Sequence, residues 1–242
     1  MALHFLTPTS TSAQVGDLVT LAGAEAKHAA VVRRVRVGES VTVGDGEGVW
    51  LEGVAEDVSA TEVRVRITAR EAEVEPEVRL SLAQALAKGD RDELAVQAAC
   101  ELGVDGVVPW QAARSISRWE GPKAAKGRER WATIVREAAK QAHRAWVPPV
   151  ENVQSTADLV ARADTERVLV LDPTAEQRLS AVRPDGRSIL LVVGPEGGIT
   201  PEELQRLENA GAERVKLGDT VLRTSTAGPA AIAVLSGILN RW

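Results

Sequence analysis

Short runs rich in valine and leucine, separated by turn residues, fill about the first 70 positions of the chain. They predict strands at Leu18–Leu21, Ser40–Gly44, Val49–Ala55 and Glu62–Ala69. Asp45-Gly46 is a tight-turn dipeptide between two of these runs, and one helix is expected over Ala24–Val35. Several short strands joined in this way predict a small β-barrel.

Strand and helix patterns alternate in the rest of the chain. Strands are predicted at Val78–Ala83, from Val107, and at Arg167–Leu171, Ile189–Val193 and Glu213–Leu217. Helices are predicted at Asp92–Leu102, Lys123–Ala142 and Ser155–Ala163, from Thr200 to Gly211, and at Thr226–Leu239. Alternation of this kind predicts an α/β fold with a mostly parallel sheet covered by helices.

The ends of several elements carry their own signals. Thr200-Pro201-Glu202-Glu203 combines an N-cap threonine with proline at the first helical position and glutamate at the third. Gly103 is placed as the glycine that ends the helix Asp92–Leu102, whose buried face we expect to carry Leu94, Ala98 and Leu102. Pro148-Pro149 is expected to stop the helix Lys123–Ala142.

An acidic stretch that contains Pro76 separates the two patterns. It runs from Glu71 to Glu77, and its composition is typical of a linker. We therefore expect an N-terminal domain over residues 1–72 and a C-terminal domain over residues 76–242.

Composition then narrows the class of protein. The longest aliphatic run, Ile189–Val193, is far shorter than the ~20 apolar residues of a membrane span. The N-terminus shows no signal-peptide pattern. A single cysteine, Cys100, and three scattered histidines offer neither an internal disulfide nor a metal-ligand cluster. We expect a cytoplasmic protein with no metal and no membrane partner.

The charge distribution bears on nucleic-acid binding. The net charge of −5 weakly disfavours such a partner, but Arg114–Trp146 holds nine Lys or Arg against three Glu, and three tryptophans. On charge alone, a solvated helix face with tryptophans packed beneath it is the favoured interpretation. In the acidic N-terminal domain, basic residues follow one another at Arg33, Arg34 and Arg36, where they either touch a polyanion or pair with carboxylates such as Glu39. Candidate RNA contacts are Arg33, Arg34, Lys88, Arg114, Lys123, Lys126, Arg128 and Arg130.

Two loops that directly follow predicted strands carry candidate chemistry. Gly194-Pro195-Glu196-Gly197-Gly198 follows Ile189–Val193, and Leu217-Gly218 through Thr224 follows Glu213–Leu217. Ligands of parallel sheets bind beyond such strand ends, where Leu171-Asp172 also lies. Glycines let backbone approach a ligand, but neither a P-loop nor a dinucleotide fingerprint is present. The residues alone indicate a small-molecule site of unknown identity, with a plain tight turn as the alternative.

These paired loops, together with Leu222-Arg223-Thr224 and Thr226-Ala227, resemble the cofactor loops of the SPOUT methyltransferases, and within them the RsmE-type enzymes. The likeness runs along the whole chain. It includes His28 with Val32-Arg33-Arg34, which resembles a PUA-like domain, Lys88-Gly89, Glu93, Gln97, Glu101–Val104, Glu137–Gln141, Arg144 and Pro148.

The resemblance implies a SPOUT domain with a deep trefoil knot, and a homodimer whose cofactor site lies near the subunit interface. It implies methylation of uracil N3 in 16S ribosomal RNA, within the small ribosomal subunit, with S-adenosylmethionine as cofactor. The small-sided last helix, with Ala227, Gly228 and Ala231, suits close packing in a knot, a dimer or a plain buried helix. The implied cofactor residues are Leu171, Gly194, Pro195, Glu196, Gly197, Gly198, Leu217, Gly218, Val221, Leu222, Arg223 and Thr224.

The resemblance also suggests catalytic roles and two departures. Arg223 and Arg144 are candidates to stabilise a developing uridinate, while Glu196 either orients the cofactor, accepts a proton or supports its own loop. Ser225 and Lys140 stand where the family has acidic residues, so neither supplies a carboxylate base. The N-terminal domain is expected to recognise RNA without taking part in chemistry.

Two other functions stay open at this point. The same fold acts elsewhere on transfer RNA or large-subunit RNA, and the chain could be an RNA-binding module without catalysis. Intact glycines in both loops favour a working cofactor site over the second of these.

Overall fold

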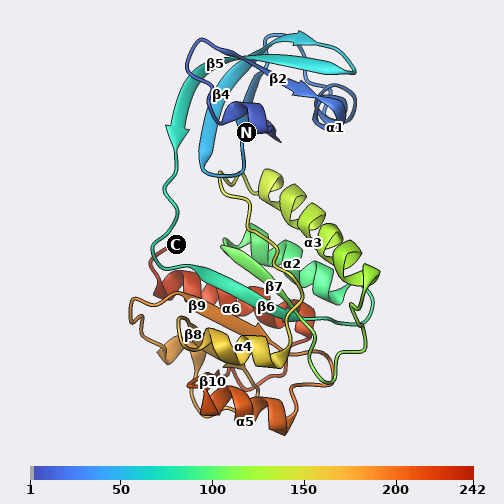
Figure 1. Cartoon of the computed structure of the whole chain (residues 1–242). Coiled ribbons are helices and arrows are strands. Elements are labelled where there is room, and N and C mark those ends of the chain that lie inside the picture. The colour runs from blue at the N-terminus through green and yellow to red at the C-terminus, as the bar shows by residue number, and fades with distance from the viewer. Residues whose placement is uncertain (1–2) are drawn as a thin grey trace. The chain divides into compact units, whose positions relative to one another are not determined.

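The computed structural model describes residues 3–242 and divides the chain into two compact units (Figure 1). The smaller unit holds the chain up to Glu75 together with Ala139–Val147, and the larger unit holds Pro76–Ala138 and Pro148–Trp242. The division between Glu75 and Pro76 lies within the expected linker. The segment Ala139–Val147 differs from our expectation, because we placed it in the C-terminal domain.

A five-stranded sheet forms the smaller unit, in the order β1-β3-β4-β5-β2. Its strands are β1 (Leu3–Leu6), β2 (Leu18–Ala22), β3 (Ser40–Gly44), β4 (Val49–Val58) and β5 (Glu62–Ala72). Its helical elements are η1 (Pro8–Ser10), α1 (Gly23–Lys27) and η2 (His28–Val32). All strand pairs are antiparallel except β1 with β3. The four predicted strands are confirmed, whereas β1 was missed because four residues carry too little pattern.

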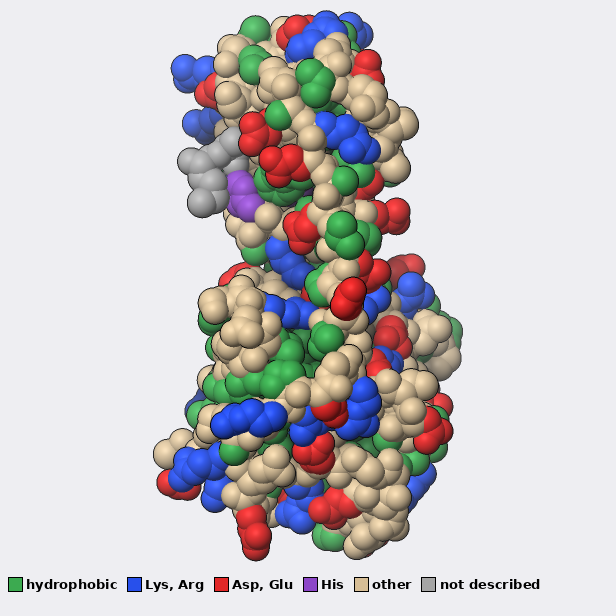
Figure 2. All heavy atoms as spheres, turned by 90° about the vertical axis from the view of Figure 1, so that its left-hand side faces the viewer, with side chains coloured by type: hydrophobic (Ala, Val, Ile, Leu, Met, Phe, Trp, Pro, Cys, Tyr) green, Lys and Arg blue, Asp and Glu red, His purple; other side chains and the backbone are tan. Residues whose placement is uncertain are grey.

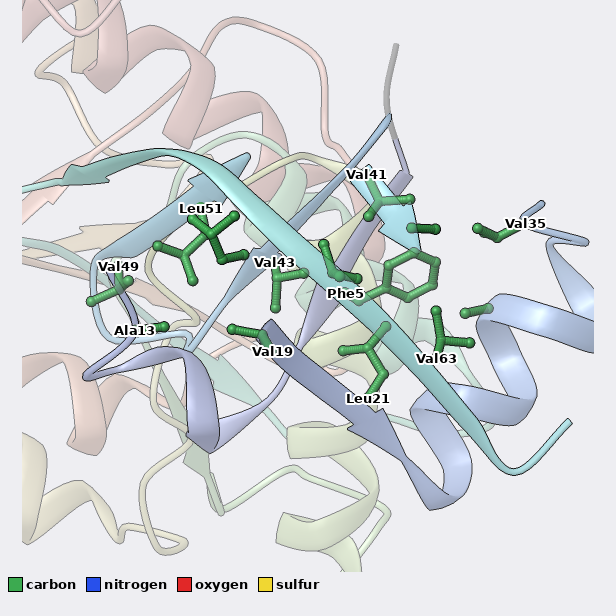
Figure 3. Packing of buried hydrophobic residues seen from close by; sticks show 14 residues of the cluster. Phe5, Ala13, Val19, Leu21, Val35, Val41, Val43, Val49, Leu51 and Val63 are labelled. Carbon is green, nitrogen blue, oxygen red and sulfur yellow. The ribbon is translucent and has the colours of Figure 1, made fainter. Parts of the chain in front are cut away.

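The sheet of the smaller unit curls around one apolar core. Alternate residues of β4 and β5 are buried, as the two-residue period of a strand requires when one face is covered. Phe5, Leu21 and Val63 meet in this core, and Leu51 lies further along it (Figure 3). The regular alternation explains why these strands were legible in the sequence.

Residues 139–147 complete the smaller unit from far along the chain. The Gly48 amide donates to the Ala145 carbonyl at 3.1 Å, and the Val147 amide donates to the Gly46 carbonyl at 2.9 Å. Lys140, with a side chain only 2% exposed, places its Nζ atom 3.0 Å from a carboxylate oxygen of Glu25. This segment is therefore fixed to the strands by both main-chain and side-chain contacts.

A five-stranded parallel sheet forms the larger unit, in the order β10-β8-β9-β6-β7. Its strands are β6 (Leu80–Ala85), β7 (Gly106–Trp110), β8 (Arg167–Leu171), β9 (Ile189–Val193) and β10 (Glu213–Val215). Its helices are α2 (Arg91–Glu101), α3 (Pro122–Gln141), α4 (Thr156–Arg162), η3 (Leu179–Ala181), α5 (Pro201–Asn209) and α6 (Thr224–Ile238). The expected α/β class is confirmed. The trefoil knot stays a prediction, because strand order does not determine how the chain threads.

Helices cover both faces of this sheet. Leu159 of α4 and Leu207 of α5 pack in one cluster with Ala83 and Ala85 of β6. On the other face, a side chain on Gly228 of α6 would touch Leu82 at 3.3 Å. The small residues of α6 therefore serve close packing on the sheet within one chain.

The structure corrects two expectations about helix α2 and helix α3. The buried face of α2 carries Ala95, Val96, Ala99 and Cys100, while Leu94 is 51% exposed. Small residues are selected there because α2 packs closely against α6. Helix α3 ends at Gln141, where His143 takes a left-handed conformation (φ 54°), well before Pro148.

Other local signals are confirmed. The capping box of Thr200 and Glu203 is formed in full, and Gly103 adopts a positive φ of 92° after α2. Lys, Arg, Asp and Glu side chains lie intermixed on the face drawn in Figure 2, without a large area of one sign. Among the helices of residues 3–242, none is long and apolar enough to span a bilayer.

Candidate active site

A cavity of about 560 Å³ opens in the larger unit at the C-terminal ends of three neighbouring strands. Leu171, Val193 and Val215 end β8, β9 and β10, and the strand register places Leu171 opposite both of the others. The loops that follow therefore emerge side by side. The lining comprises Arg91, Leu171–Pro173, Val193–Glu196, Gly198, Ile199, Leu204, Val215–Gly218, Thr220–Thr224 and Ala227.

The first glycine loop is fixed by a buried polar chain. Gln84 donates through Nε2 to the Thr224 hydroxyl at 2.9 Å, and this hydroxyl donates to the Gly194 carbonyl at 2.8 Å. A side chain on Gly194 would meet Ile199 at 2.7 Å, so only glycine fits there. Gly198 has a positive φ of 72°, which glycine adopts without strain. The start of α6 and the loop are thus held together as one wall of the cavity.

Glu196 is anchored by contacts that the sequence did not reveal. Its Oε1 atom accepts hydrogen bonds from Arg91 Nη1 at 2.8 Å and from the Lys88 amide at 3.1 Å. Burial acts to raise the pKa of Glu196, but its own amide, Arg91 and the Lys88 amide outweigh this effect and hold it below its usual range. Glu196 is therefore an ionised anchor at neutral pH.

The second loop offers a row of backbone donors. Within residues 3–242, no backbone amide from Leu217 to Arg223 donates to another protein group. Gly218 lines the cavity, and a side chain added to it would meet no atom of the described residues within 4 Å. Arg223 lines the same cavity, is exposed and has no ion pair among the described residues. This loop can therefore supply amide hydrogens and one guanidinium to a ligand.

A buried carboxylate, Asp172, stands at the end of β8. It accepts hydrogen bonds from the Thr174 amide and hydroxyl and from Arg214 Nε, the last at 2.8 Å. Burial acts to raise the pKa of Asp172, but these partners hold it below its usual range. Among the described residues, no group of three His, Cys, Asp or Glu is arranged to hold a metal ion.

The cavity brings together the predicted cofactor residues with one exception. Gly197 is absent from the lining, and a side chain there would point at Arg114 instead, at 3.3 Å. Within this pair of loops a positive φ occurs at Gly198 and not at Gly197 or Gly218. Arg144 does not line the cavity, since it lies in the segment that completes the smaller unit.

Sequence reasoning missed Arg91, Ile199, Leu204 and Thr220, which also line the cavity. Arg91 lies 105 positions from its partner Glu196, so no local pattern could pair them. Thr220 lies within the second loop and Leu204 lies in the helix after Thr200, so both stood in segments already singled out. Proximity to those motifs was the available signal.

Some of the candidate RNA contacts already have a partner within the protein, whereas others are exposed. Arg114 donates to the Gly197 carbonyl at 2.9 Å, Arg128 to the Val150 carbonyl at 3.0 Å, and Arg130 pairs with Glu93. Lys123 and Lys126 have no such partner among the described residues and border a surface hollow.

The remaining candidates are exposed. The side chains of Lys88, Arg33 and Arg34 lie at the surface, and Arg34 adopts a positive φ of 56°. The tryptophans differ in burial: Trp131 is 1% exposed, as a packed core residue would be, whereas Trp119 is half-buried at the edge of the hollow.

Known proteins share both units of this chain. A family model described as an RNA methyltransferase domain matches residues 74–236, and one described as an RNA methyltransferase PUA domain matches residues 21–68. Ribosomal RNA small subunit methyltransferase E of Mycobacterium bovis is 42% identical over 238 residues, covering 96% of this chain and 91% of that protein. The protein of the same name from Bacillus subtilis is 32% identical, with 98% and 96% covered.

Solved structures agree. Ribosomal RNA small subunit methyltransferase E of Neisseria gonorrhoeae, bound to S-adenosylmethionine, superposes with a TM-score of 0.89 at 30% identity, with 98% of each chain covered. A methyltransferase of Legionella pneumophila with the same bound cofactor gives a TM-score of 0.87 at 29% identity, again with 98% of each chain covered. This chain therefore belongs to the ribosomal RNA small subunit methyltransferase E family, with an RNA methyltransferase domain that follows a PUA domain.

Proposed function

We propose that this protein transfers the methyl group of S-adenosylmethionine to N3 of a uridine in 16S ribosomal RNA. The observation that carries the proposal is the cavity at the ends of β8, β9 and β10, which is walled by both glycine-containing loops. Family membership supports the reaction class, and two relatives hold this cofactor in their solved structures.

The residues present fit S-adenosylmethionine. The cavity volume of about 560 Å³ lies within the range of small-molecule sites. Leu171, Val193 and Leu217 offer apolar surface for an adenine ring, and the Leu217–Arg223 amides offer donors for its edge and for the ribose. When bound, the cofactor supplies an electrophilic methyl group on a sulfonium. Open space at Gly218 lets backbone approach the ligand closely.

The protein's contribution is positioning and charge stabilisation. Uracil N3 becomes a good nucleophile only when its proton leaves, and negative charge then spreads onto the ring oxygens. Arg223, exposed at the cavity and at the N-terminus of α6, is suited to stabilise that charge. Arg144 remains our second candidate for this role.

Glu196 is assigned to orientation. Arg91 and the Lys88 amide already occupy its Oε1 atom, and a pKa below the usual range makes it a weak base. Lys140, at a position where the family has an acidic residue, pairs with Glu25. We name no general base.

The substrate is proposed to be the small-subunit RNA within the ribosomal particle, and the site of action the cytoplasm, where that RNA is assembled. We also propose a homodimer. Val221 and Leu222, which line the cavity, are 79% and 37% exposed. Separately, apolar side chains gather in a patch on the face of the larger unit that Figure 2 draws. A second copy of the chain would cover such surface. Sedimentation of the purified protein is expected to give twice the chain mass.

The decisive experiment maps the modified nucleotide. Small subunits from a strain lacking this gene are incubated with the purified protein and radiolabelled cofactor, and the labelled base is identified by mass spectrometry. We expect one 3-methyluridine in 16S RNA. Label in another base or another RNA would contradict the proposed substrate. Absence of label despite cofactor binding would contradict the proposed methyl transfer.

A further inference from the structure

A hollow on the larger unit combines three cations with exposed apolar surface. It lies between the loop after β7 and the first turns of α3, and it is lined by Ile116, Ser117, Arg118, Trp119, Lys123 and Lys126. Ile116 is 68% exposed, and the Trp119 indole borders the hollow. The nearest acidic residue in sequence, Glu120, lies outside the lining.

Packing fixes the Trp119 indole in place. A side chain on Gly127 would come within 2.4 Å of the ring, so the indole lies directly on the α3 backbone there. The Trp119 ring packs nearly perpendicular to that of Trp131, which is fully buried, with ring centroids 5.1 Å apart. The Trp119 amide also donates to Gln111 Oε1 at 2.8 Å. The ring is therefore a rigid platform, which lowers the entropic cost of stacking a ligand on it.

The loop that carries this platform is tied to the candidate active site. Arg114 donates to the carbonyl of Gly197 in the first glycine loop, at 2.9 Å. One residue earlier, the Ala113 amide donates to Glu203 of α5 at 2.9 Å. Arg118 in turn donates to the Ala113 carbonyl at 3.1 Å and keeps further N–H groups for a ligand. The loop that borders the hollow is thus hydrogen-bonded to the glycine loop that forms one wall of the cavity.

We propose that this hollow binds an unpaired segment of the substrate RNA, with one base against Trp119 and Ile116 and its phosphates on Arg118, Lys123 and Lys126. Cations that follow a backbone beside an aromatic ring are the features by which proteins hold single-stranded RNA. The inference rests on the proposed function, because it takes the RNA of that reaction as the ligand. It narrows the set of candidate RNA-binding residues, since Arg128 and Arg130 are engaged within the protein.

Matched charge reversals test the binding of phosphates. Lys126→Glu and Lys123→Glu each change the charge by two units at the hollow, and Arg206→Glu does so at an exposed site on α5. Glutamate near a helix N-terminus does not weaken the helix, so α3 stays folded in Lys123→Glu. Affinity for transcribed 16S RNA is measured over a salt series. We expect both lysine variants to flatten the slope of log K against log salt by about 0.7–0.9 for each phosphate that is no longer neutralised, with Arg206→Glu unchanged.

A second pair of variants tests the stacking of the base. Trp119→Ala is expected to weaken binding of a single-stranded oligouridylate about 5- to 150-fold without altering the salt slope, the range for removal of one stacked base. Trp119→Phe keeps an aromatic face and is expected to retain most of the affinity. Cofactor binding and the thermal midpoint are followed in parallel to confirm a folded protein.

The outcomes separate this inference from the proposed function. Equal effects of Lys126→Glu and Arg206→Glu, or wild-type affinity in Trp119→Ala, would overturn the hollow as an RNA site. Loss of methyl transfer on small subunits with unchanged affinity for free 16S RNA would assign the hollow to a ribosomal protein instead. If the wild type transfers no methyl group but its RNA affinity still depends on these residues, the proposed function is wrong and the proposal that the hollow binds RNA is supported.

Discussion

Gly194 and Gly218 line the same cavity, but an added side chain would meet different surroundings at each. At Gly194 it would strike Ile199 at 2.7 Å, so this glycine is required by the packing of the loop itself. At Gly218 it would meet no atom of residues 3–242 within 4 Å and would extend into space available to a ligand. Glycine therefore serves loop stability at one position and ligand access at the other.

We predict that Gly218→Val folds normally and binds S-adenosylmethionine about 5- to 150-fold more weakly, because overpacking a close-fitting site costs about 1–3 kcal/mol. Titration calorimetry with a parallel thermal melt measures both quantities. Gly237→Val is the control, since Gly237 also has open space around it but lies outside the cavity. Unaltered cofactor affinity in Gly218→Val would remove this loop from the binding site.

Glu196→Gln distinguishes an anchor from a base. The lowered pKa means that the Glu196–Arg91 pair is fully present above the ordinary glutamate value of 4.5 and is lost only as the pH falls below it. We expect the variant to raise KM for the cofactor and to leave the shape of the kcat profile unchanged between about pH 6 and 9. A loss of about 10²–10⁴-fold in kcat would instead mark Glu196 as the proton acceptor.

The sequence identified site residues that belong to local motifs, but not those whose partners lie far away along the chain. Glycines and the apolar run Ile189–Val193 are local signals, and they located one cavity wall correctly. The pairs Arg91–Glu196, Arg214–Asp172 and Lys140–Glu25 join positions 105, 42 and 115 residues apart. Many charged partners are possible over such distances, so only the folded chain identifies them.

At the scale of elements, the capping box at the start of α5 does more than begin a helix. Glu203 is 5% exposed, and its carboxylate accepts from the Ala113 amide, the Thr156 hydroxyl and the Thr200 amide. One side chain thus joins α5 to α4 and to the loop after β7. The sequence predicted the cap but not these two further contacts, because they depend on how the elements pack.

Glu203→Ala is predicted to lower the free energy of unfolding by about 2–4 kcal/mol, since it leaves buried donors without an acceptor. Thr200→Ala, which removes only the cap, is expected to cost about 1 kcal/mol. Glu202→Ala is exposed and is expected to change stability by less than about 0.5 kcal/mol. Urea denaturation measures all three, and equal effects at Glu202 and Glu203 would contradict the bridging role.

Helix α2 shows why helical periodicity identified an element but not its buried side. The spacing of Leu94, Ala98 and Leu102 predicted a helix, and a helix is present. Its other face is buried because Ala95 and Ala99 allow α6 to approach closely, which larger side chains would prevent. The close approach of α6 decides which face of α2 is buried, and the sequence of α2 alone does not encode that approach.

For the whole molecule, the segment Ala139–Val147 sets how the chain is divided. It belongs with the strands of the smaller unit, although the polypeptide on either side of it forms the larger one. Deleting the N-terminal domain by starting the chain at Val78 would also remove Glu25, the partner of Lys140. A loss of methyl transfer in such a truncated protein would therefore not show that the N-terminal domain recognises RNA. RNA recognition by the N-terminal domain is better tested by Arg33→Glu and Arg34→Glu in the full chain, where the Lys140–Glu25 pair is kept.

Lys140→Met is predicted to lower the free energy of unfolding of the full chain by about 3–5 kcal/mol, the cost of breaking a buried ion pair from one side. The double variant Lys140→Met/Glu25→Gln is expected to recover part of that loss. Equilibrium denaturation of the wild type and the single and double variants completes the cycle. A coupling energy near zero would show that the pair contributes nothing to fixing the segment.

The origin of residues 139–147 also has a consequence for synthesis on the ribosome. Domains commonly fold in order as they emerge, the N-terminal one first. Here the smaller unit lacks the partners of Gly46 and Gly48 until Ala145 and Val147 have been made. By then β6, β7 and all of α3 have been made without β9, the central strand that pairs with β6. Neither unit can therefore finish before a long stretch of the other has been translated. During that interval the nascent chain carries a smaller unit without its last segment and a parallel sheet without its central strand.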